Sequence, residues 1–364
     1  MSNKFDKSPD REARGVDPAE PRLVEADWRR LEELRRQFLA AQEGLEGARP
    51  SAWEGERDLE LYDAVYGARI GWKWDAFLAD ALRRADLPAG ARVLDLGCGT
   101  AVASRALLRH APAGAISSVR LVDKSAAATR VGARLLARAA PGLECAPFAA
   151  DFATEEVAPP DFDVLVASHL VDELSDEGWR AALRLARRAE LVLWLEGGAK
   201  STSRALQRVR EELLEEFEPL LPCTHRESCG ALSEANAHEW CHRFARPPRE
   251  AFTTAHFTFA SKRLGLDLRS LPYCGLLLAK RARATPREPG LARLLGRAKG
   301  EKGKAMASIC DASGVRRVQI LERLGKQVVR AMVDEPGSVD LLRLRFEGGK
   351  VVGLKVVDEH DGPA

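Results

Sequence analysis

The stretch ARVLDLGCGTA, residues 91–101, decides the fold of this chain. Its first half is an apolar run typical of a buried strand, and the Ala- and Leu-rich run from 102 predicts a helix. Gly97 and Gly99 lie in the turn between them, where a residue without a Cβ lets the backbone approach a ligand. A doubly wound sheet binds nucleoside ligands beyond the carboxyl ends of its strands, so this turn is a candidate site. Asp95 is placed to fix either the turn or the charged end of the ligand.

The same alternation of apolar runs and helices continues along the chain. Strands are expected within 119–125, 143–152, 162–170, 191–198 and 271–281, and helices within 61–85, 126–140, 176–189 and 202–221. Strands that are apolar throughout, and followed by helices, imply a parallel sheet covered on both faces. The sequence therefore predicts an α/β fold with a doubly wound sheet.

Acidic residues follow the second and third predicted strands. Asp123 stands where a ribose diol would be bound, and Asp151 stands where an adenine amino group would be accepted. The chain has no G-x-G-x-x-G, which argues against a dinucleotide. This arrangement resembles class I S-adenosylmethionine-dependent methyltransferases over about residues 60–281, and the resemblance implies that cofactor. Ala101 replaces the third glycine of the usual pattern.

The segment after the fourth predicted strand, ASHLVDELSDE (167–177), is where methyltransferases place reacting groups. It contains neither a (D/N)-P-P-(Y/F) element nor a Pro-Cys pair. Ser168 is expected among the cofactor-binding residues, and His169 fits packing as well as it fits catalysis. The sequence names no catalytic residue.

A polar stretch, CTHRESCGALSEANAHEWCHRF (223–244), concentrates cysteine. Cys223, Cys229 and Cys241 lie within it, and Cys274 lies on the late strand. Zinc modules usually bring C-x₂₋₄-C pairs, which this stretch lacks, whereas four thiolates are the usual ligands of an iron–sulfur cluster. We therefore favour an iron–sulfur cluster held by these four cysteines, with zinc as the alternative. His225 and His242 are substitutes should Cys274 be too distant.

The pattern C-x-H-x-x-x-C followed by Trp-Cys-His-x-Phe resembles the methyltransferase-like proteins of the small ribosomal subunit, known in mitochondria as methyltransferase-like protein 17. ASHLVDEL and the tail GRAKGEKGKAMASICDASGVRRVQI are also similar to that family. The resemblance spans about residues 60–335. It implies binding to small-subunit rRNA during ribosome assembly, an S-adenosylmethionine pocket and a four-cysteine [4Fe–4S] cluster. Thr224 and Gly230 replace two prolines of the family pattern.

Three regions are predicted. Residues 1–50 form a charged N-terminal region, disordered over 1–20 and helical beyond about 22. Residues 51–284 form the methyltransferase-like domain, with a metal-binding insertion at about 219–270. Residues 285–364 form a small, basic, β-rich domain with strands around a DASG turn (311–314) and an EGGK turn (347–350).

Charge and hydropathy limit the kinds of partner that the chain can have. Residues 280–330 carry fourteen Lys and Arg against four Asp and Glu, an excess that favours contact with a phosphate backbone over the alternative of a solvated Arg-rich surface. Five cations of the insertion region, Arg243, Arg246, Arg249, Lys262 and Arg263, are expected to face such a backbone. No run of eighteen apolar residues or secretory segment occurs, so a cytoplasmic protein without a membrane span is expected.

Three functions remain open from the sequence. The first is an rRNA methyltransferase that uses S-adenosylmethionine. The second is a non-catalytic assembly factor of the small subunit, in which the cofactor pocket is structural or regulatory. The third is a small-molecule methyltransferase with a structural zinc.

Overall fold

The computed structural model describes residues 23–42, 53–157, 159, 161–283 and 289–357. The segment 1–20, expected to be disordered, lies outside these residues. No helix in the described ranges is both long and apolar enough to cross a membrane.

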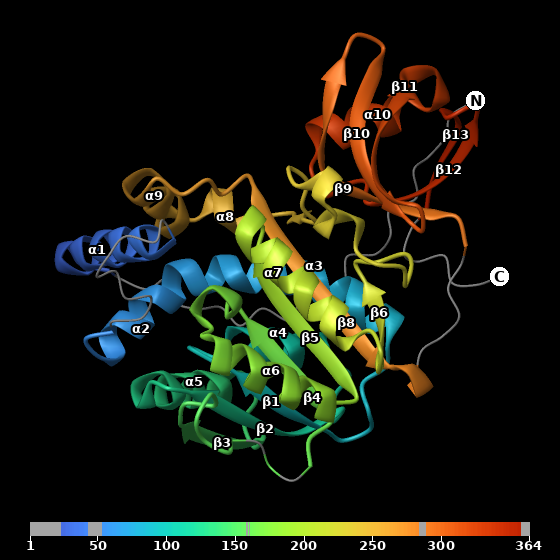
Figure 1. Cartoon of the computed structure of the whole chain (residues 1–364). Coiled ribbons are helices and arrows are strands. Elements are labelled where there is room, and N and C mark those ends of the chain that lie inside the picture. Colours follow the sequence, from blue (N-terminus) through green and yellow to red (C-terminus); the bar gives the residue numbers. More distant parts are fainter. Residues whose placement is uncertain (1–22, 43–52, 158, 160, 284–288, 358–364) are drawn as a thin grey trace.

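The larger sheet has eight strands and carries the motif turn at its centre (Figure 1). Its strands are β1 (Ala91–Leu96), β2 (Ile116–Asp123), β3 (Glu144–Ala149), β4 (Val164–Ser168), β5 (Leu191–Gly197), β6 (Phe217–Leu221), β7 (Arg243–Ala245) and β8 (Leu271–Lys280). They pair in the order β3-β2-β1-β4-β5-β8-β6, and β7 also pairs with β8. β1 to β5 are parallel, and β8 is antiparallel to β5 and β6. This is the class I methyltransferase sheet, as predicted.

Helices cover both faces of this sheet. α3 (Ala68–Arg84), α4 (Val102–His110) and α5 (Ala126–Ala139) pack on one face, and α6 (Asp176–Arg188) and α7 (Lys200–Leu213) pack on the other. Strand residues alternate between the two cores, with Val93 in the first and Leu94 in the second. The apolar strand sequences are explained by this double burial.

One predicted element is wrong. The helix expected over 202–221 ends at Leu213, and Phe217–Leu221 is the edge strand β6. Pro219 would remove a hydrogen bond from a helix interior, whereas an edge strand tolerates it. Phe217 and Leu221 are buried at alternate positions, as a strand requires.

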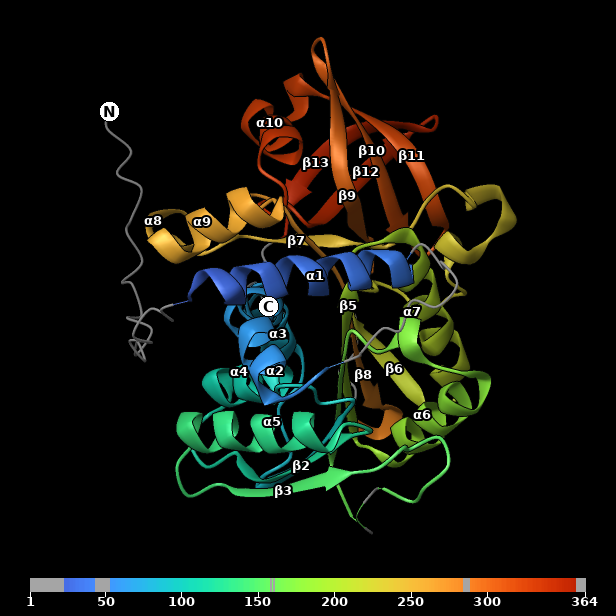
Figure 2. The ribbon, with the colours of Figure 1, turned by 90° about the vertical axis from the view of Figure 1, so that its left-hand side faces the viewer.

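The N-terminal helices pack against the side of the domain. Helix α2 (Glu56–Tyr62) continues into a π-helical turn, Asp63–Gly67, which runs into α3. Helix α1 (Glu25–Gln42) and helix α9 (Ala255–Leu264), which follows the short α8 (Glu250–Thr253), pack against this segment. Trp28 and Leu31 of α1 share a core with Leu264 of α9, so α1 lies beside α9 (Figure 2).

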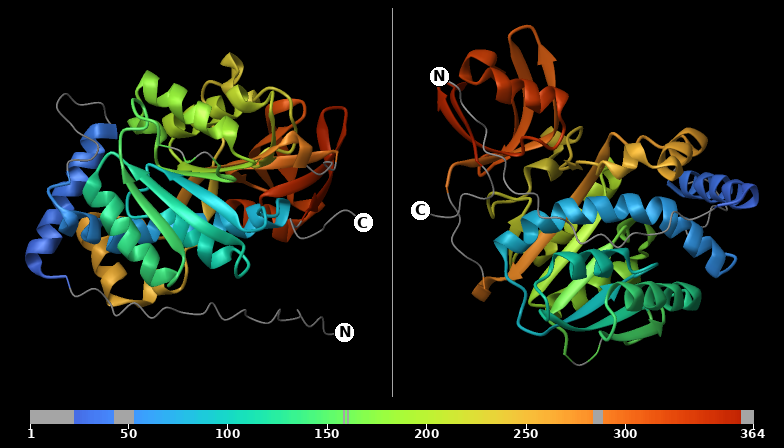
Figure 3. Two further views of the ribbon diagram at one scale, coloured as in Figure 1. Left: turned by 90° about the horizontal axis from the view of Figure 1, so that it is seen from below. Right: turned by 180° about the vertical axis from the view of Figure 1, so that it is seen from behind.

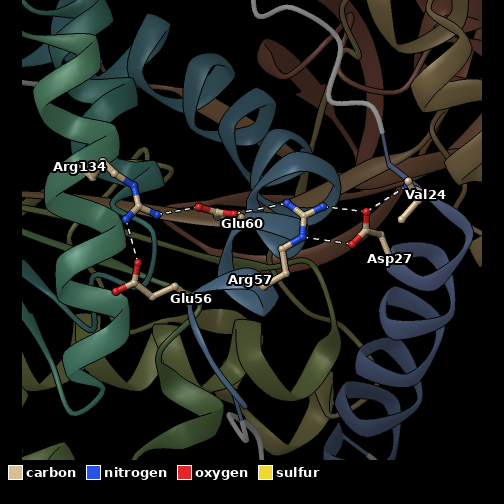
Figure 4. Close-up of polar contacts among 6 residues, drawn as sticks. All are labelled: Val24, Asp27, Glu56, Arg57, Glu60 and Arg134. Atoms are coloured by element: carbon tan, nitrogen blue, oxygen red, sulfur yellow. Dashed lines mark hydrogen bonds and ion pairs between the residues drawn. The ribbon is translucent and has the colours of Figure 1, made fainter.

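Ion pairs connect α5, α2 and α1 in series (Figure 4). Arg134 on α5 binds Glu56 and Glu60, at 2.8 and 2.7 Å. Arg57 in turn contacts Glu60 at 3.4 Å and Asp27 of α1 at 2.7 Å. Asp27 also accepts a hydrogen bond from the backbone N–H of Val24 at 3.0 Å. The pairs fix the direction in which α1 lies, although each exposed pair adds little stability.

The C-terminal region forms a second, antiparallel sheet that stands at one end of the first (Figure 1 and Figure 3). Its strands are β9 (Leu291–Glu301), β10 (Lys304–Asp311), β11 (Gly314–Leu321), β12 (Leu341–Glu347) and β13 (Lys350–Val356), with α10 (Lys326–Asp334) between β11 and β12. They pair in the order β11-β10-β9-β12-β13, and β11 also contacts β13, so the sheet curls into a barrel. The strands expected around the DASG and EGGK turns are confirmed, while β9 and α10 were not predicted.

Candidate functional site

The motif turn after β1 joins the carboxylate at the end of β2. Gly97 and Gly99 have φ angles of +66° and +50°, which glycine adopts without strain. The N–H of Gly99 donates to Asp123 Oδ2 at 3.0 Å, and the N–H of Ser125 donates to Asp123 Oδ1 at 2.8 Å. A Cβ on Gly99 would meet no atom within 4 Å, so its backbone faces open space. The turn therefore offers bare backbone and a half-buried carboxylate to a ligand.

The other two acidic residues have different surroundings. Asp95 is 1% exposed, and its Oδ2 accepts a hydrogen bond from Ser104 on α4 at 2.6 Å. Burial raises the pKa of Asp95 to about 7. Asp95 therefore joins the end of β1 to α4, and its role toward the turn or the ligand stays a prediction. Asp151 is exposed after β3, where its Oδ1 accepts from the N–H of Ala153 at 2.9 Å.

The carboxyl end of β4 presents a polar cluster. Ser168 Oγ accepts a hydrogen bond from Trp74 Nε1 at 2.9 Å and lies 3.2 Å from His169 Nδ1. His169 has a φ of +53°, a strained conformation that clusters at functional sites. Burial and the nearby cations Lys73 and Arg69 lower the pKa of His169 well below its ordinary value, so its ring is neutral at pH 7. A neutral imidazole can accept a proton.

Two residues of this cluster were missed from the sequence. Burial, together with Arg69, lowers the pKa of Lys73 to about 8. Glu196, at the end of β5, is 1% exposed and accepts hydrogen bonds from the backbone N–H groups of Leu170 and Val171. Burial raises the pKa of Glu196 to about 7. Helical spacing of polar residues at 62, 66, 69 and 73 was the available sequence signal for the lysine.

Four cysteines line one pocket between α7, the cysteine loop (residues 222–242) and the barrel. They are Cys223, Cys229, Cys241 and Cys310. The first three were predicted together, whereas Cys310 lies on β10 and was not selected. His225 Nε2 lies 3.3 Å from Cys310 Sγ, so one of the two histidines offered as substitute ligands also reaches this group.

The thiols of the pocket influence one another. Burial and the neighbouring Cys223 and Cys241 raise the pKa of Cys229 to about 12. Burial and the same cluster also raise the pKa of Cys310. Both shifts favour the protonated thiols, because anionic sulfurs in one pocket repel one another, whereas a metal bound there would favour the thiolates.

Cys274, the fourth ligand expected from the sequence, does not line this pocket. It is 1% exposed within β8, and Gln207 Nε2 donates to its Sγ at 3.4 Å. A hydrogen bond with Cys274, and burial, raise the pKa of Cys241. Cys274 therefore lies beneath Cys241 in the apolar core, because strand β8 turns its side chain toward α7. The structure thus brings three of the four predicted ligands together with a different fourth.

The pocket also contains buried positive charge. Arg210 is fully buried and Arg293 is 3% exposed, and both line the pocket. The Nε of Arg210 has no hydrogen-bond partner among the described residues. Arg210 is paired with Glu211 and Arg293 with Asp340, so the unsatisfied Nε of Arg210 is the feature that suits an anionic occupant, such as a tetrathiolate centre. Among the residues described, no three His, Cys, Asp or Glu side chains are already arranged as a metal site.

Two of the five cations expected to face a phosphate backbone do not do so. Arg243 forms ion pairs with Asp80, at 2.5 Å, and with Asp340. Arg263 pairs with Glu25 and Glu32 at 2.6 and 2.7 Å. These arginines join elements within the protein, because acidic side chains of α1, α3 and the barrel lie opposite them.

Residues 76–337 match the protein family described as mitochondrial small ribosomal subunit Rsm22. No curated protein matches the chain.

Solved structures with a similar fold include several methyltransferases. A candidate RNA methyltransferase from Pyrococcus horikoshii is 16% identical, with a TM-score of 0.35 over 57% of this chain and 83% of that chain. Magnesium protoporphyrin IX methyltransferase from Synechocystis, with bound S-adenosylmethionine, is 11% identical, with a TM-score of 0.36 over 70% and 97%. Precorrin 8W decarboxylase from Methanobacterium thermoautotrophicum is 15% identical, with a TM-score of 0.35 over 56% and 88%. At these values the fold assignment rests on the strand order of the chain itself.

Proposed function

The chain belongs to the Rsm22 family of mitochondrial small ribosomal subunit proteins, and from this we propose that it binds small-subunit rRNA during ribosome assembly and carries S-adenosylmethionine at the motif turn. The observation that carries the cofactor proposal is the connection of Gly99 to Asp123, which places open backbone beside a carboxylate at the centre of a class I methyltransferase sheet. S-adenosylmethionine would supply an electrophilic methyl group at this edge.

The residues at the strand ends would contact different parts of the cofactor. Asp123 would accept hydrogen bonds from the hydroxyl groups of a ribose, and exposed Asp151 would accept one from an adenine amino group. Ser168 would contact the cofactor or acceptor at the end of β4. His169, held neutral, can accept a proton from a nitrogen or oxygen nucleophile.

We further propose that Cys223, Cys229, Cys241 and Cys310 hold a [4Fe–4S] cluster, with zinc as the alternative. The shared pocket and the unsatisfied Nε of the buried Arg210 support this assignment. Three of these cysteines belong to the cysteine loop and the fourth to β10, so the metal centre would fasten the loop to the barrel. Metal binding can supply folding free energy that a polar loop does not obtain by burial.

A non-catalytic assembly factor is the second candidate, and one observation favours it. The segment after β4, residues 167–177, contains neither a (D/N)-P-P-(Y/F) element nor a Pro-Cys pair, so it lacks the elements that serve base-amine and carbon methylation. The family membership and the RNA partner are the same under both candidates. The two candidates differ in whether the protein transfers a methyl group.

Mass spectrometry of rRNA separates the two candidates. A strain lacking this protein is complemented with the wild type or with the Asp123→Asn variant, and rRNA methylation and small-subunit assembly are both measured. A methyl group that only the wild type restores supports the enzyme. Full assembly by both proteins without any change in methylation supports the assembly factor. A wild-type chain that does not associate with small-subunit rRNA would overturn both.

A further inference from the structure

The C-terminal barrel has the connectivity of an OB-fold. Its strands run β9, β10, β11, then α10, then β12 and β13, with β9 paired to both β10 and β12 and with β11 meeting β13. In OB-folds, the second and third strands and the loops between strands 1–2 and 4–5 bind oligonucleotides or oligosaccharides. The corresponding parts here are β10, β11 and the turns at 302–303 and 348–349. A fold alone does not assign a function, so the side chains of this face decide.

The outward face of β9, β10 and β11 is divided into two parts. Its lower part lies against the cysteine loop: Ser308 Oγ donates to Glu239 at 2.9 Å, and Asn236 Nδ2 donates to the Val315 carbonyl at 3.3 Å. Its upper part carries cations. These are Arg297 and Lys299 on β9, Lys302 in the first turn and Lys304 on β10. Arg317 on β11 lies opposite Ser308, in the part that contacts the loop. Their inward neighbours Ala298, Ala305 and Val318 are in the barrel core, which establishes that these strand cations point outward.

Most of this positive charge is available to a ligand. Arg297, Lys299 and Lys302 are exposed and form no ion pair with any other residue in the described ranges. Lys304 has a surface pair with Glu301 at 3.1 Å, whereas Arg317 pairs at 3.4 Å with Glu239, which also accepts a hydrogen bond from Ser308 at the loop contact. Residues 289–357 carry fourteen Lys and Arg against seven Asp and Glu, a net charge of +7. We call Arg297, Lys299, Lys302 and Lys304 the barrel strip.

Strands β9 to β11 contain no Phe, Tyr or Trp. Stacking on aromatic rings, which many single-strand-binding barrels use, is therefore missing from this face. Met306 lies opposite both Lys299 and Gln319, so the remaining surface is aliphatic and polar between cations. Recognition would depend on the phosphate backbone, with little preference among bases.

We propose that the barrel strip binds single-stranded RNA through its phosphates, as the contact by which the chain holds an unpaired segment of rRNA. The proposal rests on the rRNA-binding function proposed above and locates it on the barrel, away from the cofactor turn. It also gives the barrel a role in orienting RNA relative to the sheet, because the cysteine loop fixes the lower part of the same face.

The test uses the full-length chain and a labelled oligouridylate of about 12 nucleotides, within the span of one such barrel. Its binding is measured by fluorescence anisotropy over a salt series. Each single-strand phosphate contact contributes roughly −0.7 to the slope of log K against log salt concentration. The Arg297→Gln/Lys299→Gln double variant should weaken binding and make the slope shallower by about 1.4. The Lys326→Gln/Arg330→Gln double variant, which removes two cations from α10, should leave the slope unchanged.

Equal losses in the two double variants would overturn the proposal, because they would indicate attraction to net charge alone. Tighter binding to duplex RNA of the same length, or to an acidic peptide, would overturn it as well. If the Arg297→Gln/Lys299→Gln variant keeps full affinity for oligouridylate while the wild type still binds small-subunit rRNA, this inference fails and the proposed function stands. If the wild type fails to bind small-subunit rRNA at every salt concentration in the series, the proposed function itself is wrong.

Discussion

The imidazole of His225 lies with its Nε2 3.3 Å from the Sγ of Cys310, although 85 positions separate the two residues in sequence. The contact crosses from the cysteine loop to strand β10 of the barrel. Close backbone approach accompanies it, because a Cβ on Gly230 would lie 2.5 Å from the N of Val315. The polar loop is therefore held between α7 and the barrel, and the thiol pocket lies at that junction.

The identity of the fourth ligand gives the first prediction. The Cys310→Ser variant should lose most bound iron, since Cys310 lines the pocket with Cys223, Cys229 and Cys241. The Cys274→Ser variant should keep its iron, because Cys274 is buried in β8 outside the pocket. Iron content and visible absorption of anaerobically purified proteins are compared, with Cys98→Ser as the matched control. If Cys274→Ser loses its iron and Cys310→Ser keeps it, Cys274 is the fourth ligand instead.

Contact between the loop and the barrel gives the second prediction. In the Gly230→Ala variant, the new methyl group would meet the backbone of Gly314 and Val315, which cannot move aside as a side-chain end can. Overpacking of this kind costs about 1–3 kcal/mol of unfolding free energy. Urea denaturation measures it. Gly55→Ala, where a Cβ would meet nothing within 4 Å, is the control and should change stability by less than about 1 kcal/mol. Equal stability of the two variants would show that the loop does not pack closely on β11.

Cofactor binding gives the third prediction. Replacing Asp123 by Asn removes the charged group that would accept hydrogen bonds from the ribose hydroxyls. Hydrogen bonds to charged groups contribute about 1.5–3 kcal/mol of free energy. Affinity for S-adenosylmethionine should fall roughly 10- to 150-fold in calorimetry. Glu144→Gln, an exposed change on β3, should leave affinity unchanged. Unaltered binding by Asp123→Asn would mean that the ligand does not contact the end of β2.

The buried carboxyl of Asp95 gives a pH-dependent prediction. Burial raises its pKa to about 7 in the folded protein, compared with an ordinary value near 4. The folded state thus binds this proton more tightly than the unfolded state. The carboxyl therefore lowers stability progressively as pH rises from about 4 to about 7, and the whole loss is present above that range. The shift corresponds to at most about 4 kcal/mol.

The Asp95→Asn variant should remove this loss. Its unfolding free energy relative to wild type should rise between about pH 4.5 and about pH 8. Urea denaturation at both pH values provides the measurement, with Asp161→Asn, at an exposed position, as the control. A constant difference between Asp95→Asn and wild type across this range would contradict the raised pKa.

Strands β1, β4 and β5 were predictable because each is buried on both faces and its sequence is an apolar run. The turn at Gly97 and Gly99 and the acid at Asp123 follow from the same local pattern. Strand β6 was not predictable in this way, since Glu- and Leu-rich sequence before Pro219 also fits a helix. Strand β9 was missed because its second half alternates cations with small residues, as a solvated loop can.

Side chains that meet through tertiary contacts were the hardest part of the site to predict. Cys310 reaches the thiol pocket only because the barrel folds back onto the cysteine loop, and sequence spacing does not record that approach. Cys274 was the nearer candidate along the chain, but the alternation of β8 turns it into the apolar core. Lys73 on α3 and Glu196 at the end of β5 become functional candidates through their burial. The polar spacing along the helix was a sequence signal for Lys73, but it does not predict that burial.

The iron and acid-labile sulfide content of the wild-type chain, purified without oxygen, tests the central claim most directly. Four thiols converging from the cysteine loop and β10 predict about four iron and four sulfide per chain, with the visible absorption of a thiolate-bound cluster. A folded, colourless chain that contains no metal, or one zinc and no sulfide, would contradict the iron–sulfur assignment.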